Sequence, residues 1–392
     1  MTDSLAAGGP SLFANQRILI ISPQPWDHIH LSKHNYAIEL AERGNEVLFL
    51  NPPDRRGGDE FAIHQAAEDG RIRVISYRSS VPVGLRFHAR RVFDFFQRRQ
   101  MARLLERTQA IDVVWCFDFN TFSDLRVFGA RTNIYHPVDP VSDPSHVDVG
   151  RTADVILSVS KEILDSFASV RVPRFVIDHG LAPPFARHAA NPSTGERKAG
   201  PVRVGYAGNL ARPPLNRPVV TRMVTRNPEV EFHFWGPSKV LDYVPDEFRS
   251  EVQTFMNFLE AAPNVILHGP VSSERLAEEF QQMDCFVMSY RRHPTESDLS
   301  NSHKILEYFS TGKVVVSTPI ARYADHGNLL VSGMSEDDSD LPDLLSQTLA
   351  RLDEVNSESQ MAARRELALD NTYARQVDRI RDIVLALPAR QS

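Results

Sequence analysis

Short apolar runs alternate along the chain with longer segments in which apolar residues recur every three or four positions. The runs have the length and composition of strands buried on both faces of a parallel sheet, and the periodic segments are typical of helices that cover such a sheet. In the first half, strands are predicted at 17–22, 46–51, 72–76, 112–116, 133–136, 155–158 and 175–177. Helices are predicted at 32–43, 85–108 and 161–169. This order of elements predicts an α/β domain with a doubly wound sheet.

The same alternation begins again after a polar segment rich in glycine and proline at 191–201, which we interpret as a linker. In the second half, strands are predicted at 202–206, 231–235, 265–268, 284–288 and 314–317. The periodicity at 372–387 predicts a last helix with one apolar face. The resulting segments are a disordered tail at 1–16, a first Rossmann-like domain at 17–190, the linker, a second Rossmann-like domain at 202–371 and a C-terminal helix at 372–392.

The overall composition is ordinary, with 42% hydrophobic residues, 24% charged residues and a formal net charge of -6. Nucleic-acid-binding proteins are usually basic, so we expect no nucleic-acid partner. Cys116 and Cys285 fall in predicted strands and are expected to be buried free thiols of a reducing compartment. No apolar stretch has the length of a transmembrane helix, and residues 1–16 lack the features of a signal peptide. We expect a cytoplasmic protein, or one peripheral at the inner face of a membrane.

The segment at 301–319 combines a short helix, a glycine and a buried strand. The helix is preceded by three N-cap candidates, Ser300, Asn301 and Ser302. Its start therefore offers backbone N–H groups and the positive end of the helix dipole to an anion. Lys304 adds a positive charge, and Glu307 can accept hydrogen bonds from two hydroxyls. Anion and diol binding together indicate a nucleotide diphosphate with its ribose. The alternative is a surface helix that carries an ordinary Lys/Glu pair.

The run HKILEYFSTGKVVVSTP at 303–319 resembles the signature K-x-x-E-Y-x-x-x-G-K-x-V-V of GT-B glycosyltransferases related to the group 1 sugar-nucleotide transferases. The order of segments is similar over nearly the whole chain. The resemblance implies two Rossmann-like domains with a cleft between them and a C-terminal helix that crosses back to the first domain. It also implies that Lys304 meets the diphosphate and Glu307 the ribose hydroxyls.

The loop after the first predicted strand resembles the W-D…H opening of a polysaccharide-assembling branch of this class. Its candidate residues, expected to contact acceptor or donor, are Trp26, Asp27, His28 and His30. A metal site here is disfavoured, because the spacing is not H-x-x-x-H on a helix and no cysteine joins the histidines. The resemblance also implies that no bound metal is needed, since a helix terminus and basic side chains neutralise the leaving diphosphate.

Two departures from the group 1 pattern concern the donor side. Retaining members carry an Arg and a Lys after the first strand of the second domain; this chain has Gly208, Asn209 and Arg212 there, but no Lys. The first glutamate of their Glu-x7-Glu pair would fall on Leu299. Both departures favour an inverting reaction. Arg291 and Glu296 lie in a nearby loop, where they contact donor phosphates or an acidic sugar, or are simply solvated.

A third group of candidates follows the predicted strand at 133–136. His136, Asp139 and Asp143 stand beyond the carboxyl end of this strand, where ligands gather in open α/β sheets. Asp139 is predicted to be the general base that takes the proton of an acceptor hydroxyl, with Asp143 in reserve and His136 as an orienting group. The alternative is a proline-broken turn that the aspartates merely cap.

The predicted helix at 85–108 carries seven arginines against Asp94 and Glu106. Helical spacing predicts one core-facing stripe, formed by Leu85, Ala89, Val92, Phe93, Phe96 and Leu104. Phe95, Met101 and Leu105 fall outside the stripe, among the arginines. A basic face with stray apolar residues suits an anionic membrane surface, and the alternative is a solvated arginine-rich helix.

These observations predict an enzyme that moves a sugar from a UDP- or GDP-sugar to a saccharide or lipid-linked acceptor, in the synthesis of a cell-surface polysaccharide or glycoconjugate. Two alternatives remain open: a sugar-nucleotide epimerase of the same fold, and a non-catalytic GT-B binding module. The base, the sugar and the acceptor depend on variable loops.

Overall fold

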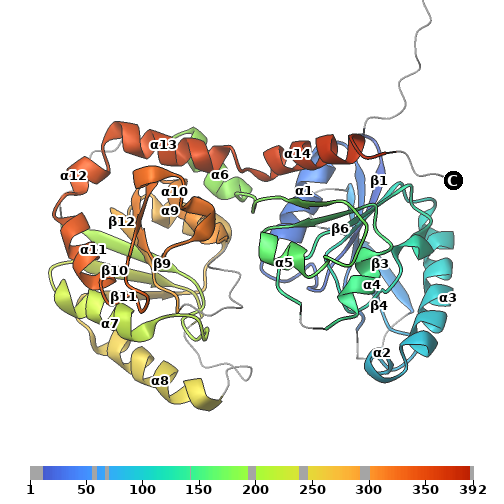
Figure 1. The fold of residues 1–392 in the computed structure, drawn as a ribbon, viewed down its shortest axis with the longest axis horizontal. Helices are drawn as coiled ribbons and strands as arrows, with labels where there is room; N and C mark the ends of the chain where they lie inside the picture. The colour runs from blue at the N-terminus through green and yellow to red at the C-terminus, as the bar shows by residue number, and fades with distance from the viewer. Residues whose placement is uncertain are drawn as a thin grey trace, which may run out of the picture. The chain divides into compact units, whose positions relative to one another are not determined.

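The computed structural model describes residues 12–54, 60–66, 70–141, 143–192, 200–237, 246–291 and 301–388. The chain forms two compact units (Figure 1): Met1–Asp178 with Tyr373–Ser392, and His179–Thr372. The division falls before helix α6 (Pro183–Ala190) rather than in the segment at 191–201. Helix α6 belongs to the second unit because its Phe185 ring packs 5.7 Å from that of Phe280.

The first unit is built on an eight-stranded sheet with the order β3-β4-β2-β1-β5-β6-β7-β8. Its strands are β1 (Arg17–Ile21), β2 (Glu46–Leu50), β3 (Phe61–Gln65), β4 (Ile72–Tyr77), β5 (Val113–Cys116), β6 (Thr132–Tyr135), β7 (Val155–Ser158) and β8 (Arg174–Val176). All pairs are parallel except β3 with β4, and β3 was not predicted. The chain runs from β1 to one side of the sheet and returns at β5 to fill the other. The crevice between the carboxyl ends of β1 and β5 is therefore the place where such sheets bind ligands.

The continuous apolar runs behave as predicted, because β1, β2 and β5 are covered on both faces. The helices of this unit are α1 (Ser32–Glu42), α2 (Leu85–His88), α3 (Arg90–Thr108), α4 (His146–Gly150), α5 (Lys161–Asp165) and α14 (Tyr373–Leu385). Helix α14 returns from the end of the chain to pack on α1, where Arg43 binds Asp378 at 2.7 Å and the rings of Tyr36 and Tyr373 are 4.9 Å apart. The crossover helix expected from the resemblance is confirmed.

The helix predicted at 85–108 is two helices, α2 and α3, separated by a break at Ala89 with φ -142° and ψ 57°. The predicted core stripe is wrong at several positions: Val92 and Phe96 are 49% and 39% exposed, whereas Met101 is buried. The inward positions of α3 also hold Gln97 and Gln100. Polar residues can face inward here because the Gln100 amide donates to the carbonyl of Arg78 at 2.7 Å and accepts from the backbone of Ser80 at 3.1 Å.

The second unit has a six-stranded, wholly parallel sheet in the order β11-β10-β9-β12-β13-β14. Its strands are β9 (Arg203–Ala207), β10 (Glu231–Trp235), β11 (Val265–Gly269), β12 (Cys285–Met288), β13 (Val314–Ser317) and β14 (Leu330–Ser332). The edge strand β14 was not predicted. Besides α6, its helices are α7 (Arg217–Arg226), α8 (Asp246–Ala261), α9 (Ser273–Phe280), α10 (His303–Phe309), α11 (Leu341–Leu349), α12 (Leu352–Val355) and α13 (Glu358–Leu369). The order reverses between β9 and β12, which places the second ligand-binding crevice there.

Helix α10 and strand β13 form the motif segment, and Gly312 between them has a φ of +81°, as predicted for a left-handed C′ residue. A side chain at this position would also collide with Met361, whose backbone oxygen lies 3.0 Å from an added Cβ. The Tyr308 hydroxyl accepts from the backbone N–H of Ala207 at 3.0 Å and fixes α10 against β9. Helix α10 is therefore held over the crevice.

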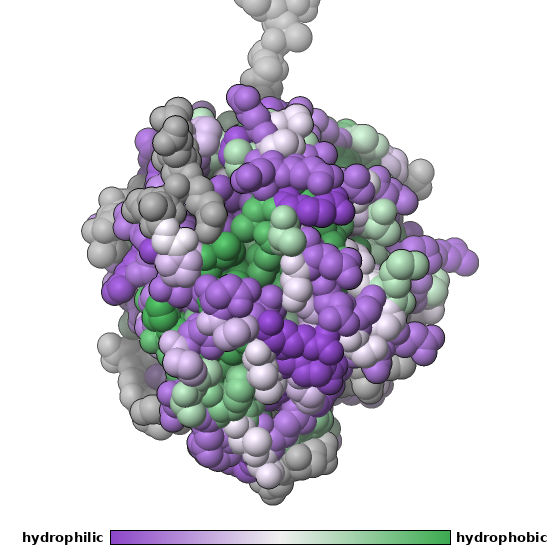
Figure 2. Space-filling view, turned by 90° about the vertical axis from the view of Figure 1, so that its left-hand side faces the viewer, coloured by the Kyte–Doolittle hydropathy of each residue, from purple (hydrophilic) through white to green (hydrophobic). Residues whose placement is uncertain are grey.

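The surfaces of the two units differ in exposed apolar side chains. Hydrophilic residues cover most of one face of the second unit, around a smaller hydrophobic area (Figure 2).

Among the described residues, none of the helices is long and apolar enough to cross a membrane. Cys116 and Cys285 are buried thiols, as predicted.

Candidate functional site

Two loops meet at the crevice of the second unit, one after β9 and the other after β12. The backbone N–H of Asn216 donates to the carbonyl of Ser289 at 2.9 Å, and that of Arg291 to the carbonyl of Pro214 at 2.7 Å. Because the carboxyl ends of parallel strands meet at one edge, this pairing brings together residues far apart in sequence. The turn that follows β9 at Gly208, called the Gly208 turn below, and α10 lie at the same edge.

Two glycines give the turn after β9 its close packing. An added Cβ on Gly236, whose φ is +127°, would lie 2.1 Å from the carbonyl oxygen of Gly208. An added Cβ on Gly208 would lie 2.7 Å from the Tyr206 hydroxyl oxygen and 3.1 Å from Cε of Lys304. The side chain of Lys304 therefore lies directly against the Gly208 turn. The sequence predicted both residues, and the structure brings them together.

Positive charge gathers beside this turn. The Lys304 ammonium lies 5.8 Å from the ring centre of Tyr290. Burial, together with the positive charges of Lys304 and Arg212 and with His179, lowers the pKa of His303 well below its ordinary value. His303 is thus a neutral imidazole close to two cations. This local field attracts an anion such as a diphosphate.

Glu307 lies on α10, one turn after Lys304. Burial raises the pKa of this carboxyl to about 7, and Lys304 opposes the rise. Within the described part of the chain the carboxylate accepts no hydrogen bond, so it is available to hydroxyl donors. Lys304 and Glu307 thus lie on successive turns of α10, and their contacts with a diphosphate and a ribose stay a prediction.

The remaining candidates of the second unit divide into three groups. Ser302 occupies the N-cap of α10, but its hydroxyl contacts Sδ of Met288 at 3.7 Å and does not cap the helix. Asn301 is buried beside it. Arg291 donates to the carboxylate of Glu251 at 2.7 Å, so its charge is engaged within the unit. Glu296 and Ser300 lie outside the described residues.

Arg217, which sequence reasoning missed, holds the turn from behind. Its buried guanidinium donates to the carbonyl of Arg212 at 2.7 Å, to that of Leu210 at 3.3 Å and to Glu251 at 3.2 Å. The Asn209 side chain supports the same turn by accepting from the backbone of Ala211 at 2.9 Å. An arginine at the start of a helix is usually exposed to solvent, so nothing in the sequence indicates that Arg217 is buried.

In the first unit, His136 is part of a buried aromatic cluster. The Trp115 indole, which can only donate, bonds Nδ1 of His136 at 3.2 Å, and the Phe117 ring stacks 5.0 Å away. The imidazole is therefore neutral with its proton on Nε2. His136 supports the end of β6 and has no basic nitrogen to offer through Nδ1.

The two aspartates after β6 differ in their environment. Asp143 accepts from the backbone N–H of Ser145 at 2.9 Å, and this bond lowers its pKa, so it caps the turn before α4. Asp139 is exposed. Lys33, at the start of α1, is a second residue that sequence reasoning missed: burial lowers its pKa to about 8, and the charges of Asp139 and Asp118 oppose that shift. Asp139 thus stands within electrostatic reach of a buried lysine.

The loop after β1 packs by its aromatic residues. Trp26 lies 4.9 Å from Phe49 and 5.3 Å from His30, whereas Asp27 and His28 are exposed. The rings of His30 and His34 stack face to face at 5.3 Å, and burial lowers the pKa of His34 to about 4. In the parts of the chain that the structure describes, no three His, Cys, Asp or Glu side chains gather as metal ligands.

Comparisons with known proteins extend this description. Residues 203–353 match the family described as glycosyl transferases group 1. No curated protein matches the sequence. Solved structures match over nearly the whole chain. Anabaena HepE, in complex with UDP and glucose, has a TM-score of 0.63 at 14% identity over 95% of this chain and 100% of its own.

Two further structures cover 95% of this chain and 100% of their own, each at 12% identity. They are the E. coli trehalose-6-phosphate protein bound with UDP-2-fluoro glucose, with a TM-score of 0.68, and sucrose-phosphate synthase from Thermosynechococcus elongatus, with 0.66. The fold is thus that of GT-B proteins, and the matched family domain contains the Gly208 turn, Lys304 and Glu307. Residues 203–353 thus match a group 1 glycosyltransferase domain, within a chain that has the GT-B fold.

Proposed function

We propose that this protein is a glycosyltransferase that transfers a hexose from a UDP- or GDP-sugar to a saccharide or lipid-linked acceptor, in the synthesis of a cell-surface polysaccharide or glycoconjugate. The observation that carries the proposal is the gathering of Lys304, Arg212 and Glu307 beside the Gly208 turn. The two cations face the diphosphate, and the Glu307 carboxylate accepts the ribose hydroxyls. Solved GT-B neighbours with UDP or a UDP-sugar support the donor class.

The chemistry assigned to the first unit is general base catalysis by Asp139. Its carboxylate is exposed beyond β6, while Asp143 and His136 are committed to structural hydrogen bonds. In the inverting reaction that we propose, Asp139 takes the proton of the acceptor hydroxyl as its oxygen attacks the anomeric carbon and the nucleotide diphosphate leaves. No metal is assigned a role.

One incubation separates this proposal from the two alternatives. The protein is mixed with a panel of UDP- and GDP-sugars, with and without saccharide acceptors, and free UDP or GDP is followed. A transferase releases nucleotide at a rate that an acceptor raises, and an epimerase returns a changed nucleotide sugar without any acceptor. A binding module gives neither product. Nucleotide-sugar conversion without acceptor would replace the proposal by the epimerase.

The peripheral location that we propose rests on a surface formed by α2 and the first turns of α3. This α2–α3 surface consists of Phe87, Arg91, Val92, Phe95, Phe96 and Arg99. Phe87 and Phe95 are 58% and 51% exposed, and the Arg99 guanidinium lies 4.5 Å over the Phe95 ring.

Charge on this surface favours an anionic partner. Within the described part of the chain, Arg91 and Arg99 pair with no acidic side chain, whereas Arg90, Arg98 and Arg103 each do. Exposed aromatic rings among unpaired arginines are the features that bind the interface of anionic membranes. We place the protein at the inner face of such a membrane.

A further inference from the structure

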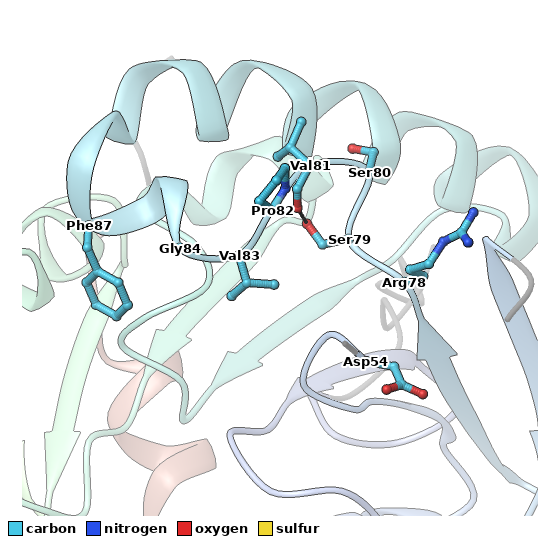
Figure 3. Close-up of a pocket in the computed structure, with 9 residues that line it drawn as sticks. All are labelled: Asp54, Arg78, Ser79, Ser80, Val81, Pro82, Val83, Gly84 and Phe87. Atoms are coloured by element: carbon cyan, nitrogen blue, oxygen red, sulfur yellow. Dashed lines mark hydrogen bonds between the residues drawn. The ribbon is translucent and has the colours of Figure 1, made fainter. Parts of the chain in front are cut away.

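The α2–α3 surface adjoins a cavity in the first unit. The cavity has a volume of about 530 Å³, within the usual range of small-molecule sites. Its walls come from the ends of β2 and β4 and from α2, and its lining is Asp54, Arg78, Ser79, Ser80, Val81, Pro82, Val83, Gly84 and Phe87 (Figure 3). Phe87 belongs both to this lining and to the exposed α2–α3 surface.

The cavity is preformed, because its walls are held by hydrogen bonds on several sides. The Gln100 amide of α3 binds the backbone of Arg78 and Ser80. The Ser79 hydroxyl donates to the carbonyl of Val81 at 2.7 Å, and the backbone N–H of Asp54 donates to that of Tyr77 at 2.8 Å. A ligand therefore meets walls that need little ordering.

The two ends of the cavity differ in chemistry. Phe87 and Arg78 stand at opposite ends of the lining (Figure 3). Phe87 offers an apolar contact that continues onto the α2–α3 surface, and Arg78 offers a positive charge to a phosphate. The carboxylate of Asp54 is an acceptor for sugar hydroxyls. A site of this kind fits a molecule with an apolar chain at one end and a phosphorylated sugar at the other.

A second, smaller cavity continues toward the crevice of the first unit. It has a volume of about 180 Å³ and shares Val83 with the first cavity. Its lining reaches Pro23 after β1 and Asp118 after β5. The charge of Asp118, like that of the assigned general base Asp139, acts on Lys33.

We infer that the cavity between Asp54 and Phe87 binds the phosphorylated sugar head group of a lipid-linked acceptor, drawn from the membrane through the α2–α3 surface. This inference rests on the proposed function. Of the two acceptor classes proposed there, saccharide and lipid-linked, it selects the lipid-linked one. The apolar chain stays with the membrane at Phe87, Phe95 and Phe96, and the head group lies along the lining toward Arg78 at the other end.

The first experiment tests the surface with vesicles of phosphatidylcholine alone or mixed with phosphatidylglycerol. The wild type sediments with the mixed vesicles, and added salt reduces the bound fraction. Replacing both Phe95 and Phe96 by Ser lowers the partition coefficient at least about tenfold, because two half-exposed rings no longer enter the interface. The matched control replaces Phe175 and Val176, which are exposed on β8, and leaves binding unchanged.

The second experiment fills the cavity. Gly84 is the position of choice, since its φ is -60° and an added Cβ meets no atom within 4 Å. Mixed vesicles are doped with polyprenyl diphosphate N-acetylglucosamine, and the soluble probe is N-acetylglucosamine 1-phosphate. Doping raises the affinity of the wild type about tenfold, as expected for a few charged hydrogen bonds. Gly84→Trp loses this increase but still binds undoped mixed vesicles. Gly70→Trp, a bulky change at an exposed glycine of the same unit, retains it.

Each outcome decides the inference. Equal binding of doped vesicles by wild type and Gly84→Trp overturns the cavity assignment, and equal affinity for the soluble phosphosugar and the doped vesicles overturns the lipid source. Calorimetry with UDP and GDP on the same proteins reports the donor site separately. Absence of nucleotide binding would therefore remove the proposed function, whereas the vesicle results concern only the acceptor.

Discussion

The two units share one architecture, a largely parallel sheet whose strand order reverses near its centre, but they differ in where they place charged and apolar side chains. The second unit gathers Lys304 and the supporting Arg217 against a tightly packed glycine turn. The first unit leaves Asp139 exposed and displays aromatic rings among arginines on α2 and α3. Of the large hydrophobic side chains described in the second unit, only Ile266 and Met334 are exposed.

This difference follows from what each unit binds under the proposed function. A nucleotide diphosphate is small and chemically constant, so a closed turn and a few fixed charges suffice. An acceptor is larger and varies between enzymes, and a general base must meet it at an open edge of the sheet. The same fold thus supports a preformed site in one unit and a surface with loops in the other.

The largest expected effect concerns the base of the first unit. Asp139→Asn keeps the size of the side chain but removes its basicity. Loss of a general base costs about 10²–10⁴ in rate, so kcat should fall by that order while nucleotide affinity stays near that of the wild type. Steady-state kinetics and calorimetry with the same nucleotide sugar measure the two quantities.

Asp143→Asn is the matched control for that variant. Its side-chain oxygen can still accept from Ser145, so we expect little change in kcat. The stereochemistry of the product is an independent check, because an inverting reaction gives an anomeric configuration opposite to that of the donor. Retained configuration in the NMR spectrum of the product would contradict the assignment of Asp139, whatever the variant does.

The second largest effect is expected when the predicted ribose contact of the second unit is removed. Glu307→Ala removes a charged hydrogen-bond acceptor, which typically costs about 1.5–3 kcal/mol. The Kd for UDP or GDP should therefore rise by roughly ten- to a hundredfold, with the fold intact. Glu278→Ala, at an exposed position of α9, is the control and should bind as the wild type does. Unchanged nucleotide affinity in Glu307→Ala would remove the ribose assignment.

The two units also differ in how much of each could be predicted from the sequence. Buried strands and the order of elements follow from local apolar patterns, and so does Gly312, whose conformation only glycine adopts easily. Lys304 and Glu307 could be identified because the donor contacts lie close together within one motif. The main features of the second unit could therefore be predicted from short stretches of sequence.

The first unit was less predictable because its features depend on tertiary packing. Gln100 faces inward because the backbone of the loop after β4 satisfies both ends of its amide, and Gln97 donates to the Tyr77 hydroxyl of β4 at 3.5 Å. That packing turns Val92 and Phe96 outward, against the spacing of their apolar side chains. Lys33, which resembles a solvated residue at a helix start, is buried, and the charge of Asp139 acts on it. Periodicity along one helix cannot report such contacts between elements.

A smaller effect, the pH dependence of nucleotide affinity, tests the role of Glu307. Burial raises the pKa of Glu307 to about 7, so below that pH the free protein carries a neutral carboxyl. Ribose hydroxyls bind the ionised form better, so binding lowers this pKa and releases a proton. Affinity for UDP-glucose should rise about tenfold between about pH 6 and about pH 8 and level off above. His303 does not titrate in this range, because its pKa is held well below the ordinary value.

Calorimetry in buffers of different ionisation enthalpy measures the released proton directly. In Glu307→Gln the proton release and the pH dependence should both disappear, since no carboxyl remains to titrate. An unchanged pH profile in that variant would show that another group controls nucleotide binding.

The smallest expected effect separates two arginines of the second unit. The guanidinium of Arg291 binds Glu251, which also accepts from Arg217, and half-exposed pairs of this kind contribute about 0–1 kcal/mol. Arg291→Ala should therefore change the Kd for UDP by no more than about twofold, because Arg217 still neutralises Glu251. Arg212, whose charge acts on His303 beside Lys304, is the comparison. Arg212→Ala should weaken binding about tenfold by removing a charged donor to the diphosphate. If Arg291→Ala instead weakens binding as strongly as Arg212→Ala, its guanidinium leaves Glu251 for the nucleotide, and the donor site reaches further along the loop after β12.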